Sequence, residues 1–533
     1  MTTTQSVLVD GEWRPSRAPV KTFTAVNPMT KTPLPDIYPV STWEEVEEAV
    51  RAGAEAAVAL RDVAPESIAL FLEAFADGIE ARTEAIVNMA HRETALSVEP
   101  RLRSVELPRT TDQLRQAAGA AREGSWRHAT LDTARNIRSM YGPLGGPVVV
   151  FGPNNFPLAF NSVSGGDAAA ALAAGNPLIA KANTGHPGTT RLLTEAAFEA
   201  VQATGLPAAT VQLLYRTSHE SGEKLVSHPL VGATGFTGSR KAGLQLKAAA
   251  DRAGRPIYLE MSAVNPVFVL PGALEERLEQ IADELFASCS LGTGQFCTKP
   301  GLVIVLDSDR SEAFLAALAD RFQSPPGVLL GEGGVWTISE GIKTLRDHGA
   351  VLIVGGEPVD GSGYQYANTL LRVSGDQFLA HPHALQTEAF GVVSLLVFAR
   401  DPDQLQAIAR RLEGSLTGSF YTHTGGEDDV LYSRIAPEVR QRVGRLLNDK
   451  MPTGVAVSPA MNHGGPYPAT GHPGFTAVGI PASMLRFGAL HSYDNVRHHR
   501  LPPELQDKNP VDRSPAERMW RYIDGVWTQE DAA

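Results

Sequence analysis

The chain has 533 residues, of which 43% are hydrophobic and 20% are charged, and these values are typical of a large globular protein with more than one domain. Its 47 Lys and Arg residues are outnumbered by 59 Asp and Glu residues, and the net charge of −12 argues against nucleic acid or an anionic membrane as the main partner. The first ten residues contain no basic segment followed by an apolar core, and no apolar run is long enough to cross a bilayer, so we expect a cytoplasmic protein.

The first part of the chain predicts a hairpin followed by helices. Asp10-Gly11 lies between strand-like residues in 8–13, which is typical of a tight hairpin turn. Ser41 and Glu44 have capping-box spacing ahead of a periodic apolar face, so a first long helix is expected there. Further helices are predicted over 67–92 and 108–123.

From about residue 138 short apolar runs alternate with Ala-rich helical stretches. The runs at 147–151, 177–180, 210–214 and 256–259 predict parallel strands in βα units. A second set at 302–306, 351–354 and 392–398 predicts another α/β domain. The segment 452–482 is rich in Gly, Pro and His, and we expect a long ordered loop at a site.

The chain contains two cysteines, whose settings differ. Cys289 follows Ile281 and Leu285 at four-residue spacing, so on a helix it shares their face and is expected to be an inert core residue. Cys297 follows a segment with two glycines, which predicts an irregular backbone where a thiolate could be stabilised and react. Taken alone, Cys297 is better explained as a packed thiol.

Three further motifs are candidates for chemistry. The segment 232–239 predicts a strand that ends in glycine and opens a helix with phosphate-binding amides, although a structural turn is as good an explanation. Glu260 ends an apolar strand, where ligands of α/β proteins bind and a desolvated carboxylate can act as a base, but most such glutamates are simply solvated. Asn155 is predicted to leave a strand and enter a helix, where its amide could donate to an oxyanion, although taken alone a local role in the turn explains it better.

Taken together and in chain order, these motifs resemble the aldehyde dehydrogenase superfamily. The matching segments are Asn155-Phe156-Pro157, Lys181, Phe236-Thr237-Gly238-Ser239, Glu260, Gly294-Gln295-Phe296-Cys297 and Glu388-Ala389-Phe390-Gly391. The resemblance implies an α/β aldehyde dehydrogenase fold with a Rossmann-like cofactor domain, an α/β catalytic domain and a small β oligomerisation arm. The boundaries it suggests are 1–126 with 142–260, 261–485, and 127–141 with 486–533, and it implies a homodimer or homotetramer.

The resemblance also implies residue roles. Cys297 would be the nucleophile, Glu260 the base that activates hydrolytic water, and Asn155 together with the Cys297 backbone amide the oxyanion hole. Among the cofactor-binding residues, Gly238 and Ser239 would lie against the pyrophosphate, Glu388 would hold the nicotinamide ribose, and Phe390 would pack beside the ring. The reaction needs no metal.

Cofactor choice is predicted from the residue three positions after Lys181. Many NAD-using relatives carry a Glu there that binds the adenosine ribose, whereas this chain has Thr184. A Glu would repel a 2′-phosphate, while a Thr hydroxyl can donate to it and Lys181 can supply positive charge. NADP is therefore favoured, with NAD still possible.

Departures from the usual motifs narrow the resemblance. Segments 388–392 and 295–301 are similar to the α-ketoglutaric semialdehyde (2,5-dioxovalerate) dehydrogenases, and bacterial NADP-dependent fatty-aldehyde dehydrogenases resemble the same chain. Arg109 is the candidate cation for a keto-acid carboxylate, or else a structural arginine. His463 lies in the late loop and would modulate Cys297 or relay a proton. A CoA-acylating relative and a catalytically silent scaffold are the alternatives from other classes.

Overall fold

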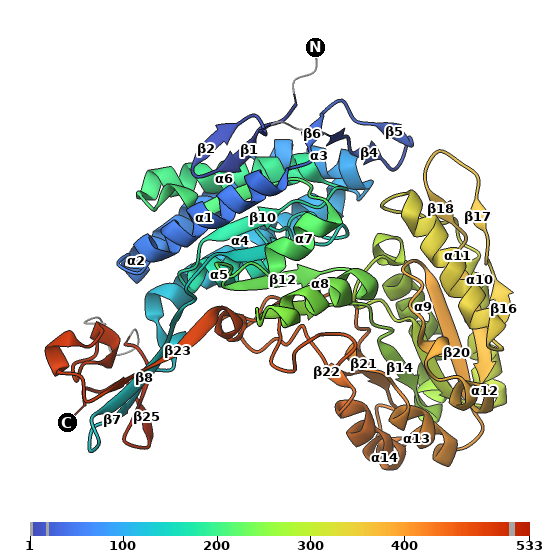
Figure 1. Ribbon diagram of the computed structural model, residues 1–533. Coiled ribbons are helices and arrows are strands. Elements are labelled where there is room, and N and C mark those ends of the chain that lie inside the picture. The colour runs from blue at the N-terminus through green and yellow to red at the C-terminus, as the bar shows by residue number, and fades with distance from the viewer. Residues whose placement is uncertain (1–3, 18–20, 511–517, 533) are drawn as a thin grey trace.

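In the computed structural model, which describes residues 4–17, 21–510 and 518–532, two seven-stranded sheets lie side by side and a five-stranded sheet projects from them. Figure 1 shows helices covering the faces of both larger sheets, with the projecting sheet at the lower left. The strands in the larger sheets are mostly parallel and buried on both faces, as expected when helices cover a sheet on each side. The predicted α/β class is therefore confirmed.

The first sheet has the strand order β13-β12-β9-β10-β11-β1-β2. The five strands β9 to β13 are parallel to one another. The β1–β2 hairpin extends the sheet beyond β11, with β1 antiparallel to β11. Asp10 and Gly11 have φ values of 52° and 74°, so the predicted tight turn is present. The bounds are β1 Val7–Val9, β2 Glu12–Arg14, β9 Val148–Phe151, β10 Leu178–Lys181, β11 Val211–Leu214, β12 Ala233–Thr237 and β13 Ile257–Glu260.

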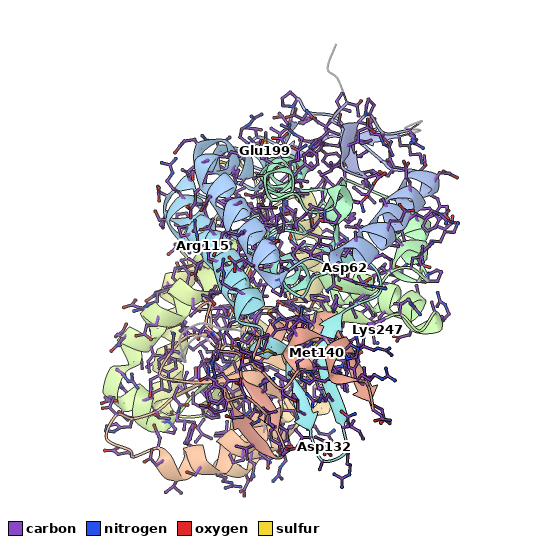
Figure 2. The ribbon with its side chains drawn as sticks, turned by 90° about the vertical axis from the view of Figure 1, so that its left-hand side faces the viewer. Asp62, Arg115, Asp132, Met140, Glu199 and Lys247 are labelled. Atoms are coloured by element: carbon purple, nitrogen blue, oxygen red, sulfur yellow. The ribbon has the colours of Figure 1, made fainter. Side chains whose placement is uncertain are left out.

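The helices of this first half pack around that sheet. They are α1 Trp43–Leu60, α2 Pro65–Ala81, α3 Thr83–Thr94, α4 Leu107–Glu123, α5 Gly166–Ala173, α6 Pro187–Thr204, α7 His219–Val226 and α8 Arg240–Arg252. The region predicted as one helix over 67–92 is two, because Arg82 leaves the helical region at φ −110° and ψ 15°. On the outside, Arg115 of α4 pairs with acidic residues of α2, and Figure 2 shows it on the same outer side as Glu199 of α6.

The start of α1 corrects one prediction. The residue whose side chain caps the helix is Thr42, which accepts from the backbone N–H of Glu45, and the expected pair of Ser41 and Glu44 is wrong by one position. Ser41 instead donates its backbone N–H to the carbonyl of Arg216, so it still belongs to an extended segment beside the sheet. Ser41 and Thr42 both have an acidic residue three positions later, so both fit the capping-box spacing. The backbone hydrogen bond from Ser41 to Arg216, which follows β11, is what leaves Thr42 as the cap.

The second sheet has the order β16-β19-β20-β15-β14-β21-β22, with β16 antiparallel at one edge and the other strands parallel. Its strands are β14 Pro266–Val269, β15 Leu302–Leu306, β16 Val351–Val354, β19 Thr369–Ser374, β20 Val393–Ala399, β21 Ser415–Tyr421 and β22 Val443–Asn448. Its helices are α9 Pro271–Ser290, α10 Asp309–Phe322, α11 Glu332–Asp347, α12 Gly375–Ala380, α13 Pro402–Arg410 and α14 Asp429–Arg440. Short two-stranded antiparallel sheets are formed by β3 Thr22–Phe23 with β6 Tyr38–Pro39, β4 Val26–Asn27 with β5 Thr32–Pro33, and β17 Pro358–Val359 with β18 Gln365–Tyr366.

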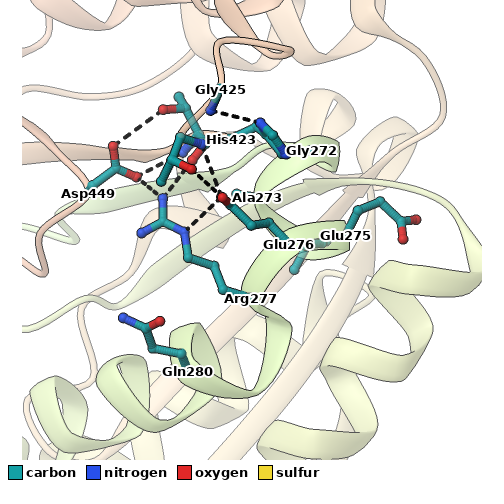
Figure 3. A network of polar contacts seen from close by, with 12 residues as sticks. Gly272, Ala273, Glu275, Glu276, Arg277, Gln280, His423, Gly425 and Asp449 are labelled. Atoms are coloured by element: carbon teal, nitrogen blue, oxygen red, sulfur yellow. Dashed lines mark hydrogen bonds and ion pairs between the residues drawn. The ribbon is translucent and has the colours of Figure 1, made fainter.

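The amino end of α9 is fixed by a polar network, shown in Figure 3. Arg277 leaves helical geometry at φ −151° and ψ 40°, donates to the Thr422 carbonyl at 2.6 Å and pairs with Asp449. The backbone N–H groups of Gly272 and Ala273 donate to one buried carboxylate at the start of α14. The network ties α9 to the ends of β21 and β22, and α9 leads directly into the segment that carries Cys297.

The projecting sheet, the arm, has the order β23-β8-β7-β24-β25. Its strands are β7 Thr130–Asp132, β8 Ile137–Pro143, β23 Gly488–Asp494, β24 Arg521–Ile523 and β25 Val526–Thr528. Figure 2 places Asp132 at its far end and Met140 nearer the body. Residues 449–481, which precede the 3-10 helix η6 Ala482–Phe487, form neither helix nor strand, as the composition of this segment predicts. Among the described residues, no helix combines the length and the apolarity needed to span a membrane.

Candidate active site

Cys297 lies on an irregular segment between α9 and β15. The preceding 3-10 turn, η4 Leu291–Gly294, has positive φ at Gly292, Thr293 and Gly294, so the chain turns sharply after α9. A Cβ at Gly294 would come within 2.2 Å of the Gly391 backbone, and only glycine permits this approach. The nucleophile segment therefore rests directly against the loop that follows Glu388. By contrast, Cys289 is fully buried on α9, and burial raises the pKa of its thiol to about 11.

Three side chains from distant parts of the chain meet at Cys297. His463 Nε2 lies 3.4 Å from the Cys297 sulfur and 2.9 Å from Glu260 Oε1. Glu260 is at the end of β13 and His463 comes from the long loop 449–481, and both are about 98% buried or more, with exposed fractions of 1% and 2%. The predicted positions of Cys297, Glu260 and His463 thus converge on one point.

The electrostatic setting keeps the resting thiol protonated. Burial, and after it the negative charge of Glu260, raise the pKa of Cys297 well above its usual value. Arg109 acts in the opposite direction but more weakly. A protonated imidazole at His463 would lie between a thiolate and a carboxylate and offset their repulsion. The arrangement therefore supplies two proton acceptors next to the nucleophile.

Asn155 projects toward the same segment. Its side-chain nitrogen donates to the Gln295 carbonyl at 2.9 Å, two residues before Cys297. The expectation that Asn155 enters a helix is wrong, because residues 152–165 are irregular and α5 begins only at Gly166. A helix is unnecessary here because side chains from elsewhere bind the backbone of this segment.

Those side chains are Arg101 and Glu106, a buried ion pair that the sequence patterns do not reveal. Arg101 donates to the Asn155 carbonyl at 3.0 Å, and Glu106 accepts from the backbone N–H groups of Leu158 and Ala159 at 2.9 and 3.0 Å. Both side chains are at most 9% exposed. The only sequence signal is a run of charges over 99–106, which resembles a solvated helix face.

Five of the six predicted cofactor residues line one cavity of about 630 Å³. Its walls include Phe151, Asn155, Lys181, Asn183, Gly238, Ser239, Glu260, Glu388 and Phe390. Ser239 caps α8, so the first N–H groups of that helix face the cavity end of β12. Thr184 is exposed and is not among the residues that line the cavity, whereas its neighbour Asn183 is.

Lys181 has a second cation nearby. Burial, and after it the positive charge of Arg216, lower the pKa of Lys181 to about 8. Lys181 ends β10 and Arg216 follows β11, so two adjacent parallel strands present positive charge at the same sheet edge. Sequence reasoning missed Arg216, although its position just after the predicted strand 210–214 was a usable signal.

A second cavity of about 900 Å³ lies on the other side of the nucleophile segment. Asn155 and Gln295 line the first cavity, whereas their neighbours Phe156 and Phe296 line the second. Cys297, which follows Phe296, therefore lies between the two cavities. The second cavity is lined by Leu96, Arg101, Val105, Glu106, Arg109, Phe156, Leu291, Phe296, Val328, Val455 and Val457, among others.

Arg109 is the notable charge in this cavity. One guanidinium nitrogen donates to the Val455 carbonyl at 2.9 Å, while Nε and Nη2 are buried without a hydrogen-bond partner. The guanidinium carbon lies 5.9 and 5.4 Å from the ring centres of Phe156 and Phe160. The structure thus brings Arg109 to the cavity beside Cys297 with unused donors.

Lys299 is another residue that sequence reasoning missed. It is buried two positions after Cys297, and its ammonium donates to the carbonyls of Val393 at 2.6 Å and Ala389 at 3.4 Å. Burial raises the pKa of Glu388, and the charge of Lys299 opposes that rise. Lys299 therefore connects the nucleophile segment to the loop of the cofactor carboxylate.

Comparison with known proteins decides the family. Residues 13–435 match the model of the aldehyde dehydrogenase family. The chain belongs to this family. An alpha-ketoglutaric semialdehyde dehydrogenase 2 of Azospirillum brasilense is 39% identical over 505 residues, which cover 92% of this chain and 94% of that protein. An alpha-ketoglutaric semialdehyde dehydrogenase of Acinetobacter baylyi is 35% identical over 534 residues, with 98% of both chains covered.

The fold of this aldehyde dehydrogenase is also found in solved structures. Aldehyde Dehydrogenase C of Pseudomonas syringae, in complex with NAD+ and octanal, gives a TM-score of 0.78 at 21% identity, covering 92% of this chain and 97% of that one. PnpE in complex with nicotinamide adenine dinucleotide gives a TM-score of 0.78 at 20% identity, covering 93% and 99%. The predicted superfamily and fold are thus confirmed, and both relatives named above carry the substrate name of the subgroup that the motifs resemble.

Proposed function

We propose that this aldehyde dehydrogenase oxidises α-ketoglutaric semialdehyde (2,5-dioxovalerate) to 2-oxoglutarate, with NADP as the preferred cofactor. The observation that carries the substrate proposal is the buried guanidinium of Arg109, which retains two unpartnered donor atoms in the cavity beside Cys297. The names of the two relatives at 39% and 35% identity support the same substrate.

Arg109 suits an aldehyde that carries a carboxylate at its other end. A guanidinium buried without full hydrogen bonding is costly, and a substrate carboxylate would satisfy its free Nε and Nη2 together. Burial lowers the pKa of Arg109, which records the same penalty for an uncompensated cation. Binding of a keto-acid carboxylate would offset that penalty and direct the aldehyde end toward Cys297.

The residues present fit a dinucleotide phosphate cofactor. The 630 Å³ cavity runs from Lys181 past Ser239 to Glu260 and Glu388, so it joins a cationic end to the carboxylate beside the reacting thiol. Lys181 and Arg216 together favour a ligand with an extra phosphate at the end of the cavity near β10. Position 184 is a threonine and not an acidic residue that would repel this phosphate. These features support NADP over NAD.

The protein groups then divide the chemistry. Glu260 or His463 takes the Cys297 thiol proton, and the thiolate adds to the aldehyde carbon. Asn155 and the Cys297 backbone N–H stabilise the oxyanion. When bound, the nicotinamide would supply the acceptor for the hydride that leaves as the adduct becomes a thioester. Glu260 then takes a proton from water that cleaves the thioester and releases the carboxylate.

One observation favours a second candidate, an aliphatic aldehyde. Apart from its charged residues, the 900 Å³ cavity is lined by apolar side chains from four segments of the chain, including Leu96, Val105, Val328 and Val457. Such a wall suits a fatty acyl chain, so an NADP-dependent fatty-aldehyde dehydrogenase is the alternative. A CoA-acylating enzyme would have no need of the Glu260 carboxylate, and a silent scaffold need not retain Cys297, Asn155 and Glu388 together. We also propose a homodimer or homotetramer, because exposed apolar residues such as Leu490 and Trp527 lie on the arm.

The substrate proposal is tested by cofactor reduction with α-ketoglutaric semialdehyde and with aliphatic aldehydes of increasing length. Arg109→Met should lower kcat/KM for the keto-acid aldehyde by about 100-fold while changing that for aliphatic aldehydes little, because it removes a charge-assisted pair with the carboxylate. Arg103→Met is the matched control, since Arg103 lies nearby but is partly exposed and pairs with Glu84. Equal losses for both aldehyde classes in Arg109→Met would remove the carboxylate role.

The cofactor proposal is tested with two variants. Arg216→Ala should raise the KM for NADP about tenfold or more and leave the KM for NAD nearly unchanged, because only NADP carries the 2′-phosphate. Thr184→Glu should shift the preference toward NAD through charge repulsion. An unaltered NADP preference in both variants would contradict the proposed phosphate site.

A further inference from the structure

The cluster at the nucleophile has the composition of a metal site. It contains a thiol, an imidazole and a carboxylate, and one donor atom from each of Cys297, His463 and Glu260 lies within 4.8 Å of the others. The sulfur lies 3.4 Å from His463 Nε2, and Nε2 lies 2.9 Å from Glu260 Oε1. These residues come from the nucleophile segment, the late loop and the end of β13, so the donor set is made by the fold.

The spacing is close to what a tetrahedral ion needs. Zinc binds sulfur at ~2.3 Å and nitrogen or oxygen at ~2.0–2.2 Å, so neighbouring ligand atoms lie about 3.4–3.6 Å apart. The 3.4 Å separation between Cys297 and His463 already fits this value. The 2.9 Å separation between His463 and Glu260 must open by roughly half an ångström, which a rotation of the carboxylate can supply.

A second observation points to a ligand at the same place. Glu260 is 1% exposed, and its Oε2 has no hydrogen-bond partner. A buried carboxylate oxygen without a partner carries a desolvation cost that a bound cation would remove. A thiolate and a carboxylate with a neutral imidazole also bring two negative charges, which match a divalent cation.

We propose that Cys297, His463 and Glu260 bind a borderline-soft divalent cation, of which zinc is the example, and that this ion inhibits the enzyme by occupying the position of the aldehyde. Thiolate and imidazole ligands select this class of ion over the hard cations magnesium and calcium. On binding, the Cys297 S–H bond is replaced by a sulfur–metal bond and the proton goes to solvent, with no change of oxidation state. Water or solvent takes the fourth position, and the ion enters through the cavity lined by Glu260.

Binding is tested on the purified full chain without cofactor or aldehyde, with cobalt(II) as the spectroscopic probe. The expected result is a thiolate-to-cobalt charge-transfer band that saturates at one ion per chain and disappears when zinc is added. Cys297→Ser should abolish the band. Glu260→Gln and His463→Gln should each weaken cobalt binding by about tenfold or more, because each removes one ligand. Cys289→Ser is the matched control and should leave the band unchanged, since Cys289 is buried on α9.

Three results would overturn the site: no charge-transfer band, a band that depends on Cys289, or unweakened binding in both Glu260→Gln and His463→Gln. The inhibition is tested separately with the wild-type enzyme, where zinc should compete with aldehyde and a chelator should restore activity. Zinc that binds without competing would refute the inhibitory role. Because the band is measured without turnover, a wrong substrate proposal leaves this result unaffected, and the two failures are distinguishable.

Discussion

Replacing Glu260 by Gln should make Cys297 more reactive toward an alkylating agent while stopping the complete reaction. The carboxylate raises the pKa of the thiol through its charge, so a neutral amide of the same shape should let the pKa fall. Below its pKa the thiolate fraction rises tenfold for each unit by which the pKa falls. The same substitution removes the group that activates water, so the thioester would persist.

The size of the effect follows from the distance. The Cys297 sulfur and a Glu260 carboxylate oxygen lie within 4.8 Å of each other. At that separation, two unit charges interact by roughly 0.9 kcal/mol in a water-like medium and by about 3.5 kcal/mol at an effective dielectric constant of ~20. These limits correspond to about 0.6 and 2.5 pKa units. A less basic thiolate is also a weaker nucleophile, with a Brønsted slope of ~0.45, so the net alkylation rate should rise by about twofold to 25-fold.

The assay is iodoacetamide labelling of the enzyme without cofactor, followed by mass spectrometry of the peptide that contains Cys297. The rate should increase with pH in both proteins, and the gain in Glu260→Gln should be largest at neutral pH and shrink as the wild-type thiol ionises. Cys297→Ser gives the background from Cys289. Labelling of Glu260→Gln at or below the wild-type rate near pH 7 would show that the carboxylate does not hold the thiol in its protonated form.

Three other changes test the groups that support the site. Lys299→Met should weaken NADP binding by about tenfold without altering the KM for aldehyde, because the loop of Glu388 loses its buried cation. Fluorescence titration measures the NADP affinity, with a melting curve as the folding control, and an unchanged affinity would contradict this role. Arg101→Met should reduce kcat by about tenfold or more with unchanged NADP affinity, since it releases the Asn155 backbone, and partial recovery in Arg101→Lys would separate positioning from misfolding. Glu93→Gln should lower the free energy of unfolding by about 1–3 kcal/mol, because the carboxylate accepts three hydrogen bonds at the start of α6. An unchanged melting temperature would refute this.

The parallel strands of the first sheet were predictable because each is a short apolar run between polar or glycine-rich segments. In the second sheet only β15, β16 and β20 were predicted, and β14, β19, β21 and β22 were missed. The runs at 147–151 and 302–306 became β9 and β15 with boundary changes of at most one residue. Helix ends were harder. The break at Arg82 has no Gly or Pro signal, and the choice between Ser41 and Thr42 as cap depends on a backbone contact with Arg216. Boundaries of that kind are set by tertiary contacts rather than by local sequence.

At the site, the sequence predicted the residues whose chemistry is visible from type and position, and missed those that act through burial. Cys297 and Glu260 stand out because a thiol follows glycines and a carboxylate ends a strand. Arg101, Glu106 and Lys299 are charged residues that would ordinarily be solvated. Nothing local shows that their partners are backbone groups of segments far along the chain. The domain boundaries and the assigned roles of the site residues stay predictions.

The late loop 449–481 has neither helix nor strand, yet it places His463 beside both Cys297 and Glu260. Its backbone is bound on both sides: the N–H of His463 donates to Thr476, and its carbonyl accepts from Ala477, both at 2.9 Å. The adjoining Phe475 ring lies 4.9 Å from the guanidinium of Arg486, which forms a buried ion pair with Asp167 of α5 at 2.8 Å. The loop is thus fixed through side chains to a helix of the first sheet. Because buried pairs of this kind are costly to break, these contacts hold His463 in place beside Glu260 and Cys297.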